Sequence, residues 1–166
     1  MRSSKGQFAA QEVLANCGFD EITDIPIERF AAGLGATFIE EELSNSDGKI
    51  IFGKNKAIIK VDSKIQFPER KRFVAAHEIG HLIMHRNLSL PADTFRNFNL
   101  IEGMEKALKS GTQEIEANEF AGELLMPEKL FLEEAWGRKF SPMLIKKLAE
   151  RFKTSITALV MEWQRT

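Results

Sequence analysis

Residues 68–86, PERKRFVAAHEIGHLIMHR, carry the most informative pattern in the chain. Apolar residues recur there at helical spacing behind a proline that suits a first helical turn, which predicts one long helix. Within it stands the motif HExxH, as His77, Glu78 and His81. Two imidazoles four residues apart lie on one face of a helix, where both can bind the same metal ion. Glu78 lies about 100° around the helix from His77, so we expect it to hold and deprotonate a water at the metal rather than to be a third ligand.

The surroundings of the motif strengthen this interpretation, because so short a pattern also occurs by chance. Apolar residues flank it on the helix, namely Ala75, Ala76, Ile79 and Leu82. Burying a His-Glu-His cluster among them would cost free energy without a partner such as a metal ion. The alternative is that both histidines are surface residues, or hydrogen-bonded core residues, of an amphipathic helix.

A catalytic zinc site needs three protein ligands and an open position for water. Cys17 is the only cysteine, which excludes an internal disulfide and a cysteine-rich zinc site. His85 continues the four-residue step, but it lies about 12 Å along the helix from His77 and some 80° around it, too far to close the same site. We therefore expect a carboxylate from a second helical segment, residues 112–125, which offers Glu114, Glu116, Glu119 and Glu123. Glu114 shares its face with small and apolar residues, whereas Glu116 and Glu123 lie on a more polar side.

Composition and charge indicate an ordinary globular protein. The chain has 166 residues, 43% of them apolar and 28% charged, with a formal net charge of −1. This balance excludes a polycationic nucleic-acid binder. No stretch approaches the roughly 18 apolar residues of a membrane helix, and the N-terminus lacks the apolar core and cleavage site of a signal peptide. We expect a cytoplasmic protein without membrane association.

The remaining segments predict an α+β fold. Residues 37–40, 49–52 and 57–61 are rich in β-forming residues, and a turn at 53–56 joins the last two, which predicts a small antiparallel sheet of about three strands. Residues 87–112 have no clean period, and we interpret them as a long loop with room for a short helix at 104–108.

Helical spacing marks several segments besides the two described above. They are residues 7–17, a helix that begins near Pro26 and ends at Gly33 or Gly35, and two short helices joined near residues 153–155. We predict a single domain over residues 1–166, with a catalytic core at 20–125 and a C-terminal helical tail at 126–166. Helices would pack on the small sheet, and the metal would lie between two of them.

HEIGHLIMH at residues 77–85, together with EIEANEFAGELLMP at 114–127, resembles the ImmA/IrrE family of metallopeptidases. The signature of that family is HExxH followed by a helix of the form E-x-x-A-N-x-F-A-x-x-L-L-M-P. The resemblance covers roughly residues 20–160 and implies a zincin-like, gluzincin-like fold. It also implies that Glu114 is the third zinc ligand, with Glu116 as the fallback. Asn118 then stands one turn after the ligand, where a polar side chain would hold a zinc-bound histidine.

The mechanism that follows is metal-assisted hydrolysis of a peptide bond. One zinc per chain would be held by His77, His81 and Glu114, although manganese or iron could use the same ligands. Glu78 would take a proton from the water and pass it to the leaving amine. Because the chain has no tyrosine, the donor that stabilises the oxyanion must be another group. His85 is our first candidate, with Arg86 or the 87–112 loop as alternatives.

Substrate binding is expected at the sheet. In zincin folds an edge strand above the metal pairs with the substrate backbone, and residues 57–61 are the nearest strand in the sequence. This predicts contacts with Ile58, Ile59 and Lys60, although an ordinary structural strand is an equal alternative. A substrate bound in this way presents an extended segment.

The resemblance implies a regulatory protease that cleaves a helix-turn-helix transcriptional repressor at a flexible segment and so induces mobile-element or stress genes. One alternative is DNA binding, because residues 148–159 resemble the core of a helix-turn-helix. The second helix of that unit is largely apolar and carries Glu162, which suits packing, so we do not expect direct nucleic-acid binding. The other alternative is a protease-inactive regulatory protein that uses metal only to stabilise its fold.

Overall fold

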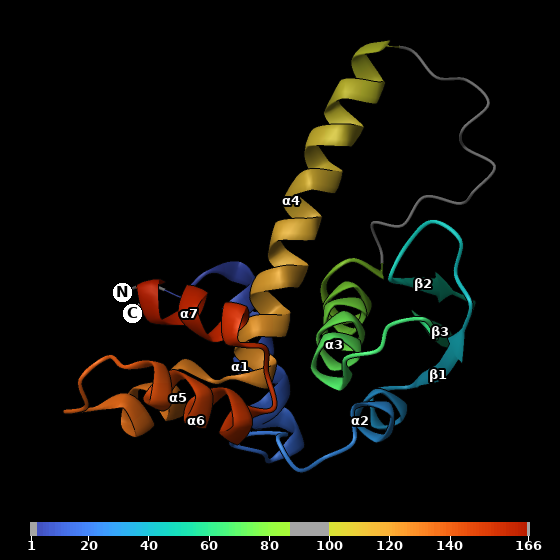
Figure 1. Ribbon diagram of the computed structural model, residues 1–166. Helices are drawn as coiled ribbons and strands as arrows, with labels where there is room; N and C mark the ends of the chain where they lie inside the picture. Colours follow the sequence, from blue (N-terminus) through green and yellow to red (C-terminus); the bar gives the residue numbers. More distant parts are fainter. Residues whose placement is uncertain (1–2, 87–99, 166) are drawn as a thin grey trace.

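The computed structural model describes the backbone of residues 3–86 and 100–165, and the side chains of 3–86 and 111–164. The fold is α+β, as the sequence predicts (Figure 1). The helices in the described parts are α1 (Lys5–Cys17), α2 (Ile27–Gly33), α3 (Pro68–Met84), α4 (Leu100–Leu125), α5 (Glu128–Ala135), α6 (Pro142–Phe152) and α7 (Ile156–Arg165). The strands are β1 (Ala36–Glu41), β2 (Gly48–Phe52) and β3 (Ala57–Asp62).

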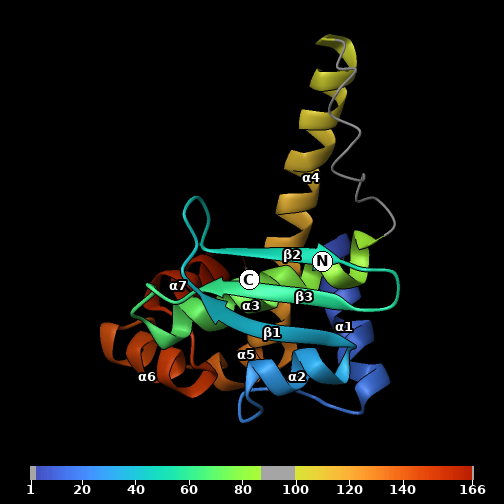
Figure 2. The same cartoon turned by 90° about the vertical axis from the view of Figure 1, so that its right-hand side faces the viewer.

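The three strands form a mixed sheet in the order β1-β3-β2 (Figure 2). β2 pairs with β3 antiparallel through the predicted hairpin, but β1 pairs with β3 parallel. The prediction of an antiparallel sheet is therefore wrong for β1. The most apolar strand takes the centre, since Ala57, Ile59 and Val61 are fully buried.

The central position of β3 also corrects the predicted substrate-binding strand. Ile58, Ile59 and Lys60 each lie between a partner residue on β1 and another on β2. Both edges of β3 are thus occupied within the sheet, and a substrate cannot add to it. Among the described strands, the hairpin has its unpaired edge on β2.

Helix α3 lies between the sheet and α4 (Figure 1). Gly80 permits close packing of the two helices, because a Cβ at this position would lie 3.2 Å from the Ala117 Cα and from a Phe120 ring carbon. Ile79, Ala117 and Phe120 are fully buried at this crossing. This contact determines which side chains of α3 lie opposite which side chains of α4.

Helix α4 begins earlier than predicted. It starts at Leu100, so the expectation of a loop is wrong for residues 100–103 and 109–111, while the short helix expected at 104–108 is part of α4. The N-terminal half of α4 projects away from the body of the protein (Figure 1). Gly103 and Gly111 each weaken a helix by about 1 kcal/mol relative to alanine, but Leu, Glu, Met, Lys and Ala around them are strong helix formers. Cooperative extension from the packed C-terminal half outweighs the glycines. The rest of the predicted loop, residues 87–99, lies outside the described residues.

The buried apolar side chains form two clusters. The larger one spans α1, α2, the sheet, α3 and α4 and runs from Ala10 to Leu125. It includes α1, which lies outside the predicted core of residues 20–125. The second gathers α5, α6 and α7 around Phe131, Phe152 and Leu159. None of the helices in the described parts of the chain combines the length and the apolarity needed to cross a membrane.

Candidate metal centre

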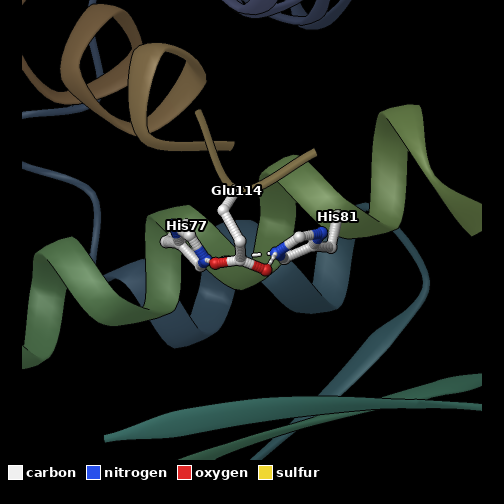
Figure 3. A group of neighbouring side chains, drawn as sticks. All are labelled: His77, His81 and Glu114. Atoms are coloured by element: carbon white, nitrogen blue, oxygen red, sulfur yellow. Dashed lines mark hydrogen bonds and ion pairs between the residues drawn. The ribbon is translucent and has the colours of Figure 1, made fainter. Parts of the chain in front are cut away.

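His77 and His81 project from α3 toward Glu114 on α4, whose carboxylate lies between the two imidazoles (Figure 3). His77 Nε2 is 3.1 Å from Glu114 Oε2, and His81 Nε2 is 3.2 Å from Glu114 Oε1. The two Nε2 atoms are 3.1 Å apart. The three potential ligand atoms all lie within 4.8 Å of one another, so the group could hold a metal ion.

A hydrogen bond to His77 and a lowered pKa of His81 favour the metal-binding form of the two imidazoles. His77 Nδ1 lies 2.9 Å from Asn118 Oδ1, and because an amide oxygen can only accept a hydrogen bond, Nδ1 is the donor and the lone pair is on Nε2. Burial, and next the charge of His77, lower the pKa of His81 to about 4, so that this ring is neutral. Two nitrogen lone pairs and a carboxylate that face one point repel one another unless a cation lies between them. The donor set therefore fits a divalent metal.

Glu78 lies beside this group in a desolvated position. It is 6% exposed, and its pKa is raised to about 7 by burial and, to a smaller extent, by the negative charge of Glu114. The carboxyl lies under the start of β2, because a Cβ on Gly48 would be 3.1 Å from Glu78 Oε1 and would overlap the Val74 side chain. A carboxyl with a pKa near neutrality can both accept and return a proton.

His85 lies behind His81, away from Glu114. Its Nδ1 is 2.9 Å from His81 Nδ1, its Nε2 is 2.8 Å from Glu116 Oε2, and the side chain is 2% exposed. Because both ring nitrogens face protein groups, the geometry does not support the predicted donation to a substrate carbonyl. Glu116 likewise faces His85 rather than the histidine pair, so the geometry favours Glu114 over the fallback ligand.

The face of α4 that carries Glu116 and Glu123 is more buried than predicted. Helix α1 covers it, and Lys5 Nζ lies 2.8 Å from Glu116 Oε1 while Gln11 Nε2 lies 2.9 Å from Glu123 Oε1. The sequence does hold a signal for this packing. Gly6 and Ala10 are small residues four apart, which is typical of a helix face that approaches another helix closely.

A cleft of about 1500 Å³ runs past the histidines. All of β2 lines one side of it, and residues at the start of α7 line another. His77, Glu78, His81 and Glu114 open into the same space. The cleft can therefore bring a bound chain to the histidines and to the buried carboxyl.

Comparisons with known proteins identify the family of the chain and a similar fold. Residues 31–164 match the IrrE N-terminal-like domain (Peptidase_M78). The solved structure of a Mycobacterium tuberculosis transcriptional regulator is similar in fold, with a TM-score of 0.62 and 16% sequence identity over 93% of this chain. The chain spans 44% of the length of that structure. Among curated protein sequences, none matches the chain. Because the family match covers most of the sequence, the chain belongs to the IrrE N-terminal-like domain family, Peptidase_M78.

Proposed function

We propose that this protein is a zinc-dependent regulatory endopeptidase that cleaves a helix-turn-helix transcriptional repressor at a flexible segment, and thereby induces mobile-element or stress genes. The observation that carries the proposal is the convergence of His77, His81 and Glu114 beside the buried Glu78, in a chain of the Peptidase_M78 family. The solved protein of similar fold is a transcriptional regulator, which is consistent with a role in transcription.

The three converging side chains form a donor set that suits zinc. Two neutral imidazoles and a carboxylate are common ligands of catalytic zinc, and manganese or iron accept the same donors. When bound, the metal supplies Lewis acidity toward the substrate carbonyl and the attacking water. Asn118 would hold the ring of His77 in the orientation that its 2.9 Å contact shows.

Glu78 is the proton carrier in the proposed reaction. Its carboxylate accepts a proton from the attacking water and later donates it to the nitrogen of the leaving amine, while the C–N bond breaks and a C–O bond forms. In the metal-free protein, burial and then the charge of Glu114 raise the pKa of Glu78 to about 7, so this position lets the carboxyl hold a proton more readily than an exposed glutamate does.

Strand β2 replaces residues 57–61 as the proposed substrate-binding strand. Within the described sheet β2 pairs with β3 alone, so its other edge has backbone N–H and C=O groups that can pair with an extended chain. Gly48, at the start of β2, lies against Glu78. A segment added along β2 therefore runs past the proton carrier. This geometry suits a flexible segment better than a folded domain.

The oxyanion of the transition state needs a donor other than tyrosine, which the chain lacks. Arg86 follows the C-terminal end of α3 and lines the cleft. We assign the donor role to Arg86 in preference to His85, because both ring nitrogens of His85 contact protein groups.

The test uses purified, zinc-loaded protein with helix-turn-helix repressors and with casein as an unstructured probe. We expect a cut in a flexible segment, identified by mass spectrometry of the products. Glu78→Gln should keep zinc and lose cleavage by about 100-fold or more, whereas Glu114→Ala should lose zinc and cleavage together. Cleavage that persists in Glu78→Gln contradicts the proposal. A repressor that the wild type binds but never cuts would instead support a metal-stabilised regulatory binding protein.

A further inference from the structure

A chain of hydrogen bonds runs from His81 to the protein surface, on the side opposite Glu114. It passes from His81 Nδ1 to His85 Nδ1 over 2.9 Å, and from His85 Nε2 to Glu116 Oε2 over 2.8 Å. The Lys5 ammonium then donates to the two Glu116 oxygens at 2.8 and 3.0 Å. The exposed fraction of the side chains rises along it, from 2% for His85 to 13% for Glu116 and 66% for Lys5. The outer end is anchored on α1.

These hydrogen bonds run in one direction when the His85 ring is neutral. The Glu116 carboxylate can only accept a proton, so His85 Nε2 must carry the hydrogen. In the neutral His85 ring, Nδ1 is then the acceptor, and His81 Nδ1 is the donor. This leaves the lone pair of His81 on Nε2, the atom that lies 3.2 Å from Glu114 Oε1. With a neutral His85, the outer residues thus favour the tautomer of His81 that can bind a metal.

Helix α1 is built to place the outermost member of the chain. Ser4 and Gln7 form a capping box that begins the helix at Lys5. A Cβ on Gly6 would overlap the Glu116 carbonyl oxygen and lie 2.7 Å from the Glu119 Cβ, so only glycine permits this approach of α1 to α4. The close approach brings the Lys5 ammonium to the Glu116 carboxylate.

We propose that His85, supported by Glu116 and Lys5, is a positioning residue that holds His81 in the tautomer and orientation that bind the metal. The inference rests on the proposed function, because it takes His81 as a metal ligand. His85 acts through His81 and touches neither substrate nor metal. Residues that orient a metal-binding histidine from behind typically change metal affinity by about 10–100-fold when they are replaced.

The experiment measures the zinc affinity of the full chain by competition with a chromophoric chelator. His85→Leu fills the buried site without a hydrogen-bonding group and should weaken zinc binding about 10–100-fold. His85→Gln should restore most of this loss, because the amide oxygen can accept from His81 while the amide nitrogen donates to Glu116. Glu116→Met should weaken binding in the same direction as His85→Leu. Glu133→Met, at an exposed position on α5 away from this contact, is the matched control and should leave the affinity unchanged.

The comparison between two substitutions of one residue separates positioning from general packing. Equal zinc affinities for His85→Leu and His85→Gln, whether wild-type or reduced, would overturn the inference. The unfolding temperature of each metal-free variant shows whether it is folded, and Glu116→Met gives an independent reading if His85→Leu does not fold. A wild type that binds no zinc would overturn the proposed function and the inference with it. If the wild type binds zinc and the variants bind it with the same affinity, the inference about His85 is wrong and the proposed function stands.

Imidazole nitrogen NMR of the wild-type chain gives a second reading that does not depend on catalysis. We expect the protons on Nδ1 of His81 and Nε2 of His85. A proton on Nδ1 of His85 and an unprotonated Nδ1 on His81 would reverse the direction of the chain and contradict the role of His85.

Discussion

Replacing Glu78 by glutamine should stabilise the metal-free protein, and increasingly so as the pH rises. Glu78 is 6% exposed, and its pKa is raised to about 7 by burial first and by the charge of Glu114 second. The ionised carboxylate therefore opposes folding, whereas an amide of the same shape carries no charge. The buried position that suits Glu78 as a proton carrier should therefore lower the free energy of unfolding of the metal-free protein.

The sign and the size of this effect follow from proton linkage. Between pH 4.5 and about 7 the folded state keeps the Glu78 proton that the unfolded chain releases, so the free energy of unfolding falls as the pH rises through this window. A pKa raised from 4.5 to about 7 corresponds to roughly 3 kcal/mol, at about 1.4 kcal/mol per pH unit. The gain from Glu78→Gln should be small near pH 4.5 and should approach roughly 3 kcal/mol at pH 8.

The assay is urea unfolding followed by circular dichroism, with chelator present, at steps from pH 4.5 to 8. Glu133→Gln is the matched control, because Glu133 is exposed on α5 and its replacement should give no pH-dependent gain. Glu114→Gln should reduce the pH dependence of the wild type, since it removes the second cause of the raised Glu78 pKa. A gain from Glu78→Gln that is the same at every pH would refute the reasoning.

Three further substitutions test other parts of the site and the fold. Gly48→Ala should lower the kcat of cleavage while zinc affinity changes little, because its Cβ would overlap the Val74 side chain and lie 3.1 Å from Glu78 Oε1, and so displace β2 from the carboxyl. An equal loss of zinc would contradict this. Gly80→Val should separate α3 from Ala117 on α4. The variant should therefore be less stable by about 1–3 kcal/mol in urea unfolding and should bind zinc more weakly. Zinc affinity at the wild-type value would contradict this prediction. Glu123→Gln should stabilise the protein increasingly as the pH rises above 4.5, because burial raises the pKa of Glu123 and the folded state then loses stability as the pH rises. Unfolding curves with a pH-independent difference would refute this.

The parts of the site that depend on local periodicity could be predicted from the sequence. A four-residue step on a helix places His77 and His81 on one face whatever the rest of the chain does. The helical period of residues 112–125 likewise separates the face of Glu114 from that of Glu116. The position of Asn118 one turn after Glu114 followed from the family signature, and the structure places its amide at His77.

The parts that depend on long-range packing could not be predicted. Strand order is set by which strand is buried on both faces, and the central place of residues 57–61 depends on partners distant in the sequence. The burial of Glu116 and Glu123 follows from α1, which lies about a hundred residues earlier in the chain. The prediction that His85 donates to the substrate rests on its place just after the motif and on the absence of tyrosine, neither of which gives its contacts. Its contacts are decided by α4 and α1 together.

The most direct test of the central claim is the metal content of the purified protein, measured by elemental mass spectrometry beside Glu114→Ala. Glu114 is half exposed, so its replacement should leave the fold intact. We expect about one zinc per wild-type chain and little or none in the variant. No metal in the wild type after incubation with zinc, or the same metal content in both proteins, would contradict the claim.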